Sequence, residues 1–337
     1  MKKIYVLLAA GIALGILTAL PGNLRLAIGE PTGPKSYELT RVDKGKKIKV
    51  MTPNLMQKGA GAPEEFAVYT TGKIDDLEIT LIDANKNESF DEIGTDGFIL
   101  GKSLYALPVS RIINIKNKLY ECEIQNTGER ITLTPYQGDC GEVDMLSNFK
   151  CPLKPEMLIL KSADIYLDVS KSKTTLVPVG SYNLWLGYIP DKKCSMAIKA
   201  GEMKNIEVAK EADKDGKPKP VQVKWGGPYK LDCSCTIQDG KVTIPESVSV
   251  YGSAGEEYCN FSPSILPAMV EVFDASKKSV AKGAISRTIA ATDQNPNSGV
   301  RGGYEGVIKK GAEGPYTLKI LIKSSVLGEL KGEKEIK

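Results

Sequence analysis

The sequence predicts an all-β fold built of tandem β-sandwich modules, and three observations predict it. Short runs that alternate apolar and polar residues recur along the chain, as in Leu77–Ile82, Val221–Trp225 and Tyr316–Ile322. A period of two with Val, Ile, Thr and Tyr is typical of half-buried strands. The 33 glycines and 19 prolines suit many tight turns. No long helices separate the strands, so sandwiches are favoured over a parallel, doubly wound sheet.

The first segment has the form of a secretory signal. Lys2 and Lys3 precede an apolar run, Ile4–Leu20, and small residues at Ala27 and Gly29 suit cleavage. We therefore predict a signal peptide over residues 1–29 and a secreted, periplasmic or cell-surface protein. An uncleaved anchor is the alternative, because the run of 17 residues is at the lower limit for a span. The chain would then touch the membrane through this segment alone.

The rest of the chain divides at two breaks. Glu211–Pro220 is charged and punctuated by prolines, which predicts a linker over 211–220. The 117 residues of 221–337 match the size of one immunoglobulin-like sandwich. Before the linker, the stretch Cys151–Pro155 separates a β-domain over 30–152 from a smaller module over 156–210. Only Met145–Phe149 and Glu202–Asp213 give weak helix signals.

The smaller module carries a resemblance. Val177-Pro-Val-Gly-Ser-Tyr-Asn-Leu184, followed by Ala200-Gly-Glu-Met-Lys-Asn-Ile206, resembles the P-x-G-x-Y-x-L … A-G-E pattern of carboxypeptidase-regulatory-like and PEGA-type β-modules in secreted bacterial proteins. Gly311-Ala-Glu-Gly-Pro-Tyr-Thr-Leu318 repeats the Gly-x-Tyr-x-Leu element. The resemblance implies a turn shaped by proline and glycine, then a strand opened by a tyrosine whose ring lies in the core. It also implies a structural or binding accessory without catalytic residues.

Composition excludes several function classes. The chain has no histidine, which rules out Ser-His-Asp and Cys-His nucleophile systems and histidine-ligated zinc or haem. The 45 basic and 41 acidic residues give a net charge of +4, which becomes 42 − 41 = +1 without Lys2, Lys3 and Arg25. Such a balance gives no electrostatic case for binding nucleic acid or an anionic membrane.

An Asp- and Asn-rich segment is the strongest candidate for a functional site. Oxygen-bearing side chains follow the D-x-N-x-N start of a calcium loop, in which alternate residues turn inward onto one cation. Glu88 stands where a glycine normally turns the loop and Gly94 where the bidentate acid belongs, so Asp96 would take that role. A metal-free, Asx-rich turn is the competing interpretation. The predicted calcium ligands are Asp83, Asn85, Asn87, Ser89, Asp91 and Asp96.

Seven cysteines in an exported chain favour disulfides, and the odd number leaves one unpaired or intermolecular. Cys233 and Cys235 are two apart on an expected strand, so they face the same way, and a bond from one of them to Cys259 is the favoured pairing. A Cys-x-Cys metal or redox site is the alternative, but it lacks further ligands. The disulfide candidates are Cys122, Cys140, Cys151, Cys194, Cys233, Cys235 and Cys259.

These observations predict a secreted, non-enzymatic accessory of the bacterial envelope with a structural, adhesion or ligand-binding role. The expected partner is an envelope protein or a polysaccharide. Two alternatives stay open: an extracellular polysaccharide hydrolase that uses paired carboxylates, and a subunit of a larger envelope complex. A hydrolase would show two carboxyl groups in a cleft, one with a raised pKa.

Overall fold

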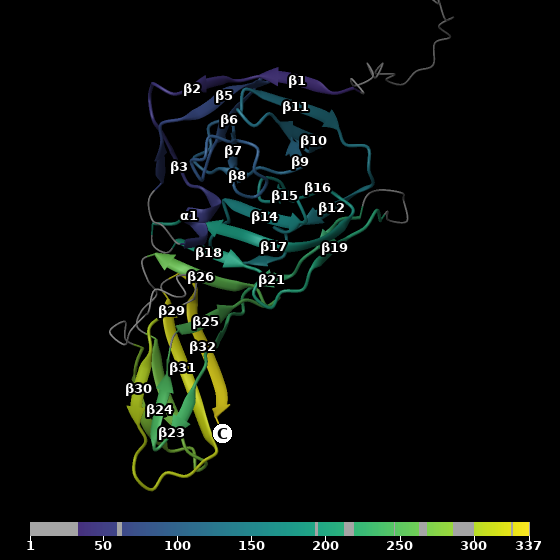
Figure 1. Cartoon of the computed structure of the whole chain (residues 1–337). Coiled ribbons are helices and arrows are strands. Elements are labelled where there is room, and N and C mark those ends of the chain that lie inside the picture. The colour runs from purple at the N-terminus through teal and green to yellow at the C-terminus, as the bar shows by residue number, and fades with distance from the viewer. Residues whose placement is uncertain are drawn as a thin grey trace, which may run out of the picture. The chain divides into compact units, whose positions relative to one another are not determined.

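The protein is all-β, as expected. The computed structural model describes residues 33–58, 63–192, 195–211, 219–245, 247–262, 268–285, 300–324 and 326–336 (Figure 1). Within these ranges it contains strands β1–β32 and one short helix, α1 (Pro53–Lys58). No helix in this part of the chain combines the length and apolar character of a membrane span. The expected signal peptide over 1–29 lies outside the described residues.

The first module, residues 35–135, packs two antiparallel sheets on one core. One sheet consists of β9 (Ile112–Ile115), β10 (Lys118–Ile124), β11 (Arg130–Pro135) and β1 (Lys35–Glu38). The other consists of β2 (Thr40–Val42), β5 (Tyr69–Ile74), β6 (Leu77–Ile82), β7 (Gly97–Leu100) and β8 (Leu107–Pro108). A separate hairpin joins β3 (Ile48–Val50) to β4 (Glu64–Phe66). Alternate residues of β6, Ile79 and Leu81, enter the core, as their spacing predicts.

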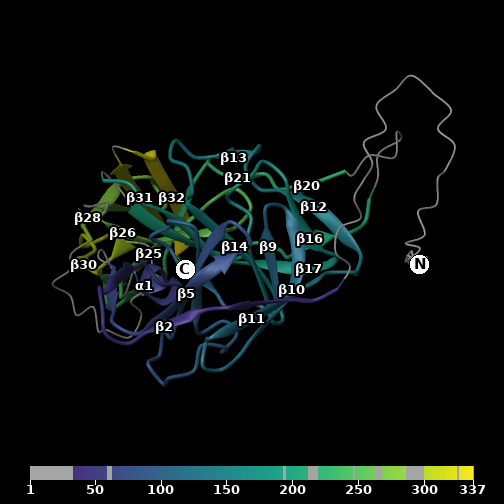
Figure 2. The same cartoon turned by 90° about the horizontal axis from the view of Figure 1, so that it is seen from above.

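The second module, residues 140–208, follows after a short connection. It contains β12 (Cys140–Asp144), β13 (Phe149–Lys150), β14 (Met157–Ser162), β15 (Ile165–Asp168), β16 (Thr175–Pro178), β17 (Gly180–Ile189), β18 (Ser195–Lys199) and β19 (Ile206–Val208). The long strand β17 pairs with β14, β18 and β19. β12 and β16 lie side by side in both views (Figures 1 and 2).

The third module, residues 230–336, is reached through two short strands, β20 (Val221–Gln222) and β21 (Trp225–Gly226). It contains β22 (Lys230–Asp232), β23 (Thr236–Gln238), β24 (Lys241–Ile244), β25 (Ser247–Tyr251), β26 (Glu257–Ser262), β27 (Met269–Phe273), β28 (Ser279–Ala284), β29 (Val300–Arg301), β30 (Tyr304–Val307), β31 (Tyr316–Ser324) and β32 (Gly328–Ile336). The antiparallel hairpin β31–β32 is paired along its whole length.

Hydrogen-bonded sheets cross the borders expected at residues 152 and 220. β18 pairs with β26, so one sheet continues from the second module into the third. β20 pairs with β12 and β21 with β13, both in parallel. The second and third modules are therefore joined by backbone ladders. Residues 212–218 of the expected linker lie outside the described part of the chain.

Neither weak helix signal produces a helix in the residues that the structure describes. Within Met145–Phe149, the carboxylate Oδ1 of Asp144 accepts the N–H groups of Leu146 (3.2 Å) and Ser147 (2.9 Å), which forms an Asx turn instead. The described part of Glu202–Asp213 forms β19, because Ile206 and Val208 alternate into the core. Both helix predictions are wrong because local side-chain hydrogen bonds and tertiary packing outweigh weak propensity.

The repeated Gly-x-Tyr-x-Leu element makes the same tyrosine hydrogen bond in both modules. The Tyr182 hydroxyl donates to the Pro178 carbonyl (3.0 Å), and the Tyr316 hydroxyl donates to the Ala312 carbonyl (3.1 Å). Each bond reaches back four residues and fixes the turn before the strand, as the tyrosine corner of immunoglobulin-like sandwiches does. The Tyr182 ring is buried in the core, whereas Tyr316 is half-buried.

We expect Tyr182→Phe to lower the free energy of unfolding by about 1–3 kcal/mol, because the buried Pro178 carbonyl loses its donor. Tyr316→Phe removes the matching hydrogen bond at a more exposed position, where water can replace the lost donor. Its free energy of unfolding should therefore fall by less. Urea denaturation followed by circular dichroism measures both. Equal losses in the two variants would contradict the burial argument.

Candidate functional site

The Asp- and Asn-rich segment forms a loop between β6 and β7 that is bracketed by two buried carboxylates, Asp83 and Asp96. Asp83 Oδ1 accepts the N–H groups of Lys86 (2.6 Å) and Asn87 (3.2 Å), and its Oδ2 accepts that of Glu88 (2.7 Å). Lys86 and Glu88 have positive φ angles of 61° and 71°. The carboxylate therefore supplies the turn that the sequence lacks a glycine to make.

Asp96 closes the loop from the other end. Its Oδ1 accepts the Ala84 N–H (3.1 Å) and its Oδ2 accepts the Glu92 N–H (3.0 Å). Burial raises the pKa of Asp96 to about 6, against the effect of these two backbone donors, and the charges of Asp83 and Glu92 raise it further. The loop thus gathers negative charge in a poorly solvated place.

Four of the six predicted ligands gather in this loop, and the other two do not join them. Nδ2 of Asn85 (2.5 Å) and Nδ2 of Asn87 (3.0 Å) both donate to Glu92 Oε2, so the two amides meet this carboxylate through nitrogen, and Asn87 Oδ1 accepts the Ser89 N–H (2.9 Å). Ser89 and Asp91 instead bond to each other through Ser89 Oγ and Asp91 Oδ1 (2.6 Å) in an exposed position.

Sequence reasoning missed Glu92 as a member of this site. The calcium-loop spacing places the bidentate acid at position 94, where this chain has Gly94. Nothing in that spacing indicates an acid two residues earlier, at Glu92. Within the described residues, no group of three or more Cys, Asp or Glu side chains is arranged to hold a metal ion.

The loop is also anchored to the opposite sheet. Phe90 is buried, and its N–H donates to the Asn126 carbonyl (2.9 Å) in the turn between β10 and β11. Gly128 in that turn has a φ of 74°, and a Cβ there would lie 2.8 Å from the Phe90 ring. This hydrogen bond and this packing hold the loop against the turn between β10 and β11.

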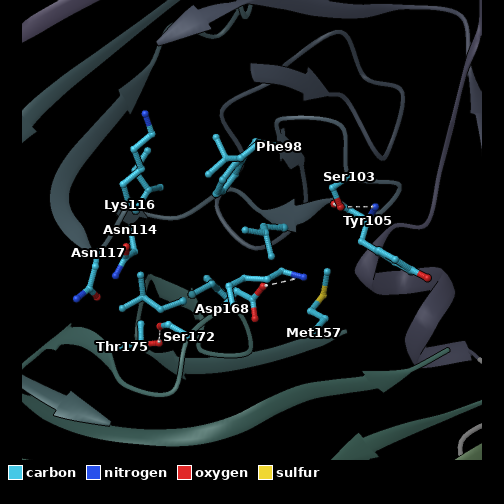
Figure 3. Close-up of a pocket in the computed structure, with 16 residues that line it drawn as sticks. Phe98, Ser103, Tyr105, Asn114, Lys116, Asn117, Met157, Asp168, Ser172 and Thr175 are labelled. Atoms are coloured by element: carbon cyan, nitrogen blue, oxygen red, sulfur yellow. Dashed lines mark hydrogen bonds and ion pairs between the residues drawn. The ribbon is translucent and has the colours of Figure 1, made fainter. Parts of the chain in front are cut away.

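A second feature, which sequence reasoning did not find, is a cavity of about 460 Å³ between the first and second modules (Figure 3). Phe98, Leu107 and Ile113 line it from the first module, and Met157, Tyr166 and Leu167 line it from the second. The volume falls within the range of small-molecule sites, which are mostly apolar with a few placed polar groups.

Side chains of the first module hold the two walls together. Asn114 Nδ2 donates to the Leu176 carbonyl (3.0 Å), and Asn117 Oδ1 accepts the Leu176 N–H (2.9 Å). Buried Ser110 Oγ accepts the Tyr166 N–H (2.9 Å). One residue of β16 and one of β15 are thereby fixed to the first module, so the cavity is held open between bonded walls.

Asp168 is the acidic side chain of the cavity lining, and its side chain is only 5% exposed. Oδ1 accepts the N–H groups of Leu158 (3.1 Å) and Ser170 (2.9 Å). Oδ2 lies 4.0 Å from Lys171 Nζ, which is longer than a hydrogen bond. Burial raises the pKa of Asp168, and the Ser170 hydroxyl, these backbone donors and Lys171 oppose that rise. A carboxylate oxygen can accept more than one donor, so Oδ2 has capacity to accept from a ligand besides Lys171.

Lys171 makes its shorter ion pair with a second carboxylate, that of Glu156. Its Nζ donates to Glu156 Oε1 at 2.8 Å and to the Glu156 backbone carbonyl at 2.5 Å. Glu156 is not part of the described cavity lining. The cavity therefore presents a single carboxyl group, where the hydrolase alternative needs a facing pair.

The cysteines are spread over separate cores. Cys122 packs in the first module, and burial raises its pKa to about 12. Cys233 and Cys235 pack against the large core that includes Tyr258, whereas Cys259 lies in a different cluster with Met56 and Leu186. Tyr258 and Cys259 are neighbours on β26 and so face opposite sides of the sheet.

The structure thus does not bring Cys259 to Cys233 or Cys235. No disulfide joins any two of the cysteines in the described ranges, which include Cys140 and Cys151 as well. Cys194 lies outside these ranges. The favoured pairing needs Cys259 close to Cys233 or Cys235, whereas the alternation of β26 places Cys259 in another core cluster.

The chain matches no protein-family model and no curated protein. Among solved structures it is similar to "The crystal structure of Ruminococcus gnavus beta-glucuronidase in complex with uronic isofagomine", with a TM-score of 0.17 and 9% sequence identity. The match covers 91% of this chain and 44% of the enzyme, so the chain spans less than half the length of that protein. A TM-score this low supports no conclusion about function.

Proposed function

We propose that the protein is a secreted, non-enzymatic accessory of the bacterial envelope that binds a small ligand in the cavity between its first and second modules. The observation that carries this proposal is the cavity itself. It has apolar walls from two modules, a buried carboxylate and a set of side-chain bonds that keep the walls in place. Preformed, mostly apolar hollows of this size are typical binding sites.

The use of the buried carboxylates supports a non-enzymatic role. Three buried carboxylates each accept two or three backbone or hydroxyl donors that shape the chain around them: Asp83, Asp96 and Glu256. A general acid or base must reach the reacting atoms with a free lone pair or proton. These carboxylates instead stabilise turns and strand junctions by accepting hydrogen bonds from them.

Ligand-observed NMR with a set of small apolar and polar compounds tests the cavity. Compounds that bind the wild-type chain should lose their signal with Leu107→Trp, because the larger ring fills the space between the walls. Leu104→Trp is the matched control, since Leu104 is 61% exposed and does not line the cavity. Binding that survives Leu107→Trp in a folded protein would place the ligand elsewhere and contradict the proposal.

We further propose that the Asp83–Asp96 loop binds calcium as a structural ion, with Asp83, Asn85, Asn87, Glu92 and Asp96 as its oxygen ligands. The support is the position of Glu92 and the two asparagine amides between the buried carboxylates; on binding calcium, both amides would have to turn so that Oδ1 replaces Nδ2 at the cation. Calcium prefers such hard oxygen donors. The expected partner of the whole protein, an envelope protein or polysaccharide, belongs to the same proposal.

Calcium should raise the melting temperature of the wild-type chain, because at 100 times its Kd a ligand stabilises by about 2.7 kcal/mol. Glu92→Gln should lose most of this response, and Ser89→Ala, in the same loop but outside the cluster, should keep it. Asp83→Ala is a poor test, since it also removes the acceptor of three N–H groups. Identical melting curves with calcium and with chelator would refute the site.

A further inference from the structure

Around the cavity, two carboxylates, Glu156 and Asp168, share one ammonium group, that of Lys171. Lys116 and Lys171 are the basic residues of the described lining. Lys116 Nζ is 2.7 Å from Asp76, and Lys171 Nζ is 2.8 Å from Glu156, and neither of these carboxylates lines the cavity. Each lysine is thus neutralised from outside. Lys171 lies 4.0 Å from Asp168 as well, so its single positive charge faces two carboxylates and one negative charge is in excess on the cavity side.

The rest of the lining suits an apolar body that carries a positive group. Phe98, Tyr105 and Tyr166 contribute aromatic surface, and aromatic faces attract cations as well as apolar groups. Tyr166 already has one such contact, with Lys161 Nζ 5.1 Å from its ring centroid. Figure 3 shows Asp168 at the lower side of the set, between Ser172 and Met157, with a dashed line that marks its ion pair with Lys171.

We propose that the cavity recognises a small organic monocation, an amine with an apolar body, whose ammonium group binds Asp168 Oδ2. This inference rests on the proposed function, because it assigns the ligand class of the same cavity. Burial of a carboxylate is costly without a charged partner, and a bound ammonium group relieves that cost. An anion is disfavoured, since both lysines are already paired.

Three probes of similar shape separate the ligand classes: phenethylamine, phenethyl alcohol and phenylacetate. At neutral pH and low salt, saturation-transfer NMR and calorimetric titration with the full chain should give the amine an affinity roughly 10–100-fold above the alcohol, the range that a charge-assisted hydrogen bond provides. Phenylacetate should bind most weakly. A preference for the alcohol or the acid would overturn the assignment.

Asp168→Asn is the decisive variant. It keeps an oxygen for the N–H groups of Leu158 and Ser170 but removes the charge. The amine and the alcohol should then bind with about equal affinity. Asp164→Asn makes the same charge change on an exposed turn next to β15 and should leave the preference intact. An unchanged preference in Asp168→Asn would also overturn the assignment.

The two proposals fail in different ways. If the alcohol or the acid binds as well as the amine and Leu107→Trp blocks it, the cavity is a ligand site and the amine assignment is wrong. If every compound still binds to the Leu107→Trp variant, the cavity is not the ligand site and the proposed function is contradicted. If none of the three probes binds, the amine assignment falls, and the wider compound set decides on the cavity.

Discussion

Glu256→Ala is expected to lower the free energy of unfolding by at least about 3 kcal/mol. The side chain is fully buried beside β26. Its Oε1 accepts the Gly226 N–H (2.6 Å) and the Tyr258 hydroxyl (3.1 Å), and its Oε2 accepts the Ala254 N–H (3.0 Å). Alanine leaves all three donors buried without an acceptor, and each costs about 1–3 kcal/mol.

Glu256→Gln is the matched control. It keeps one acceptor oxygen and the side-chain volume, so we expect a loss of about 1–2 kcal/mol. Denaturant titration followed by circular dichroism measures both variants. An alanine variant as stable as the glutamine variant would show that the carboxylate does not join β21 to β26 as described.

The same carboxyl group makes stability depend on pH. Burial raises the pKa of Glu256 above its ordinary value of 4.5, although its hydrogen-bond donors oppose the shift. A raised pKa means that the folded state holds the proton more tightly than the unfolded state. This contribution is complete below pH 4.5 and is lost as the pH rises through the folded-state pKa. Glu256→Gln should remove that part of the pH dependence.

Trp225→Ala should have a comparable or larger effect, about 4–6 kcal/mol. The indole is fully buried, its Nε1 donates to the Met145 carbonyl (2.6 Å), and its ring centroid lies 4.2 Å from that of Phe149. The substitution leaves a large hollow and an unpaired carbonyl at the junction of β13 and β21. The other tryptophan, Trp185, is only half-buried.

Trp185→Ala is therefore the control, and we expect it to cost less than Trp225→Ala. Trp185 keeps an edge-on contact with Tyr166 at 5.1 Å, so some loss remains. Urea denaturation compares the two variants. A larger loss for Trp185→Ala would contradict the burial order.

The strands were predictable because their signal is local. The alternation of Leu77–Ile82 sets both the strand and the face that enters the core, and the Gly-x-Tyr-x-Leu element predicts where β17 and β31 begin. The pairing between modules was not predictable. β18 and β26 are separated by many residues, and no local pattern specifies which strand edges meet. Predicted tandem immunoglobulin-like modules thus remain a proposal, whereas the all-β class is confirmed.

The candidate sites divide in the same way. The Asp83–Asp96 loop was found because its polar residues are close in sequence and their spacing carries the signal. The cavity was missed because its walls come from Phe98–Asn117 and Met157–Thr175, two segments brought together by Asn114, Asn117 and Ser110. Asp168 reads in the sequence as an ordinary turn residue, and only its burial marks it out.

The ladder between β18 and β26 decides how the molecule can be dissected. A fragment that starts at residue 219 would expose the donors and acceptors of β26 that β18 now satisfies, and open edges of this kind promote aggregation. Among the described residues no strand pairing crosses the connection at 136–139, so a cut there leaves the sheets intact but exposes the core cluster that Met51 and Met56 share with Met157 and Leu186. That cut also separates the two walls of the cavity. No fragment made by cutting there can therefore contain the complete binding site.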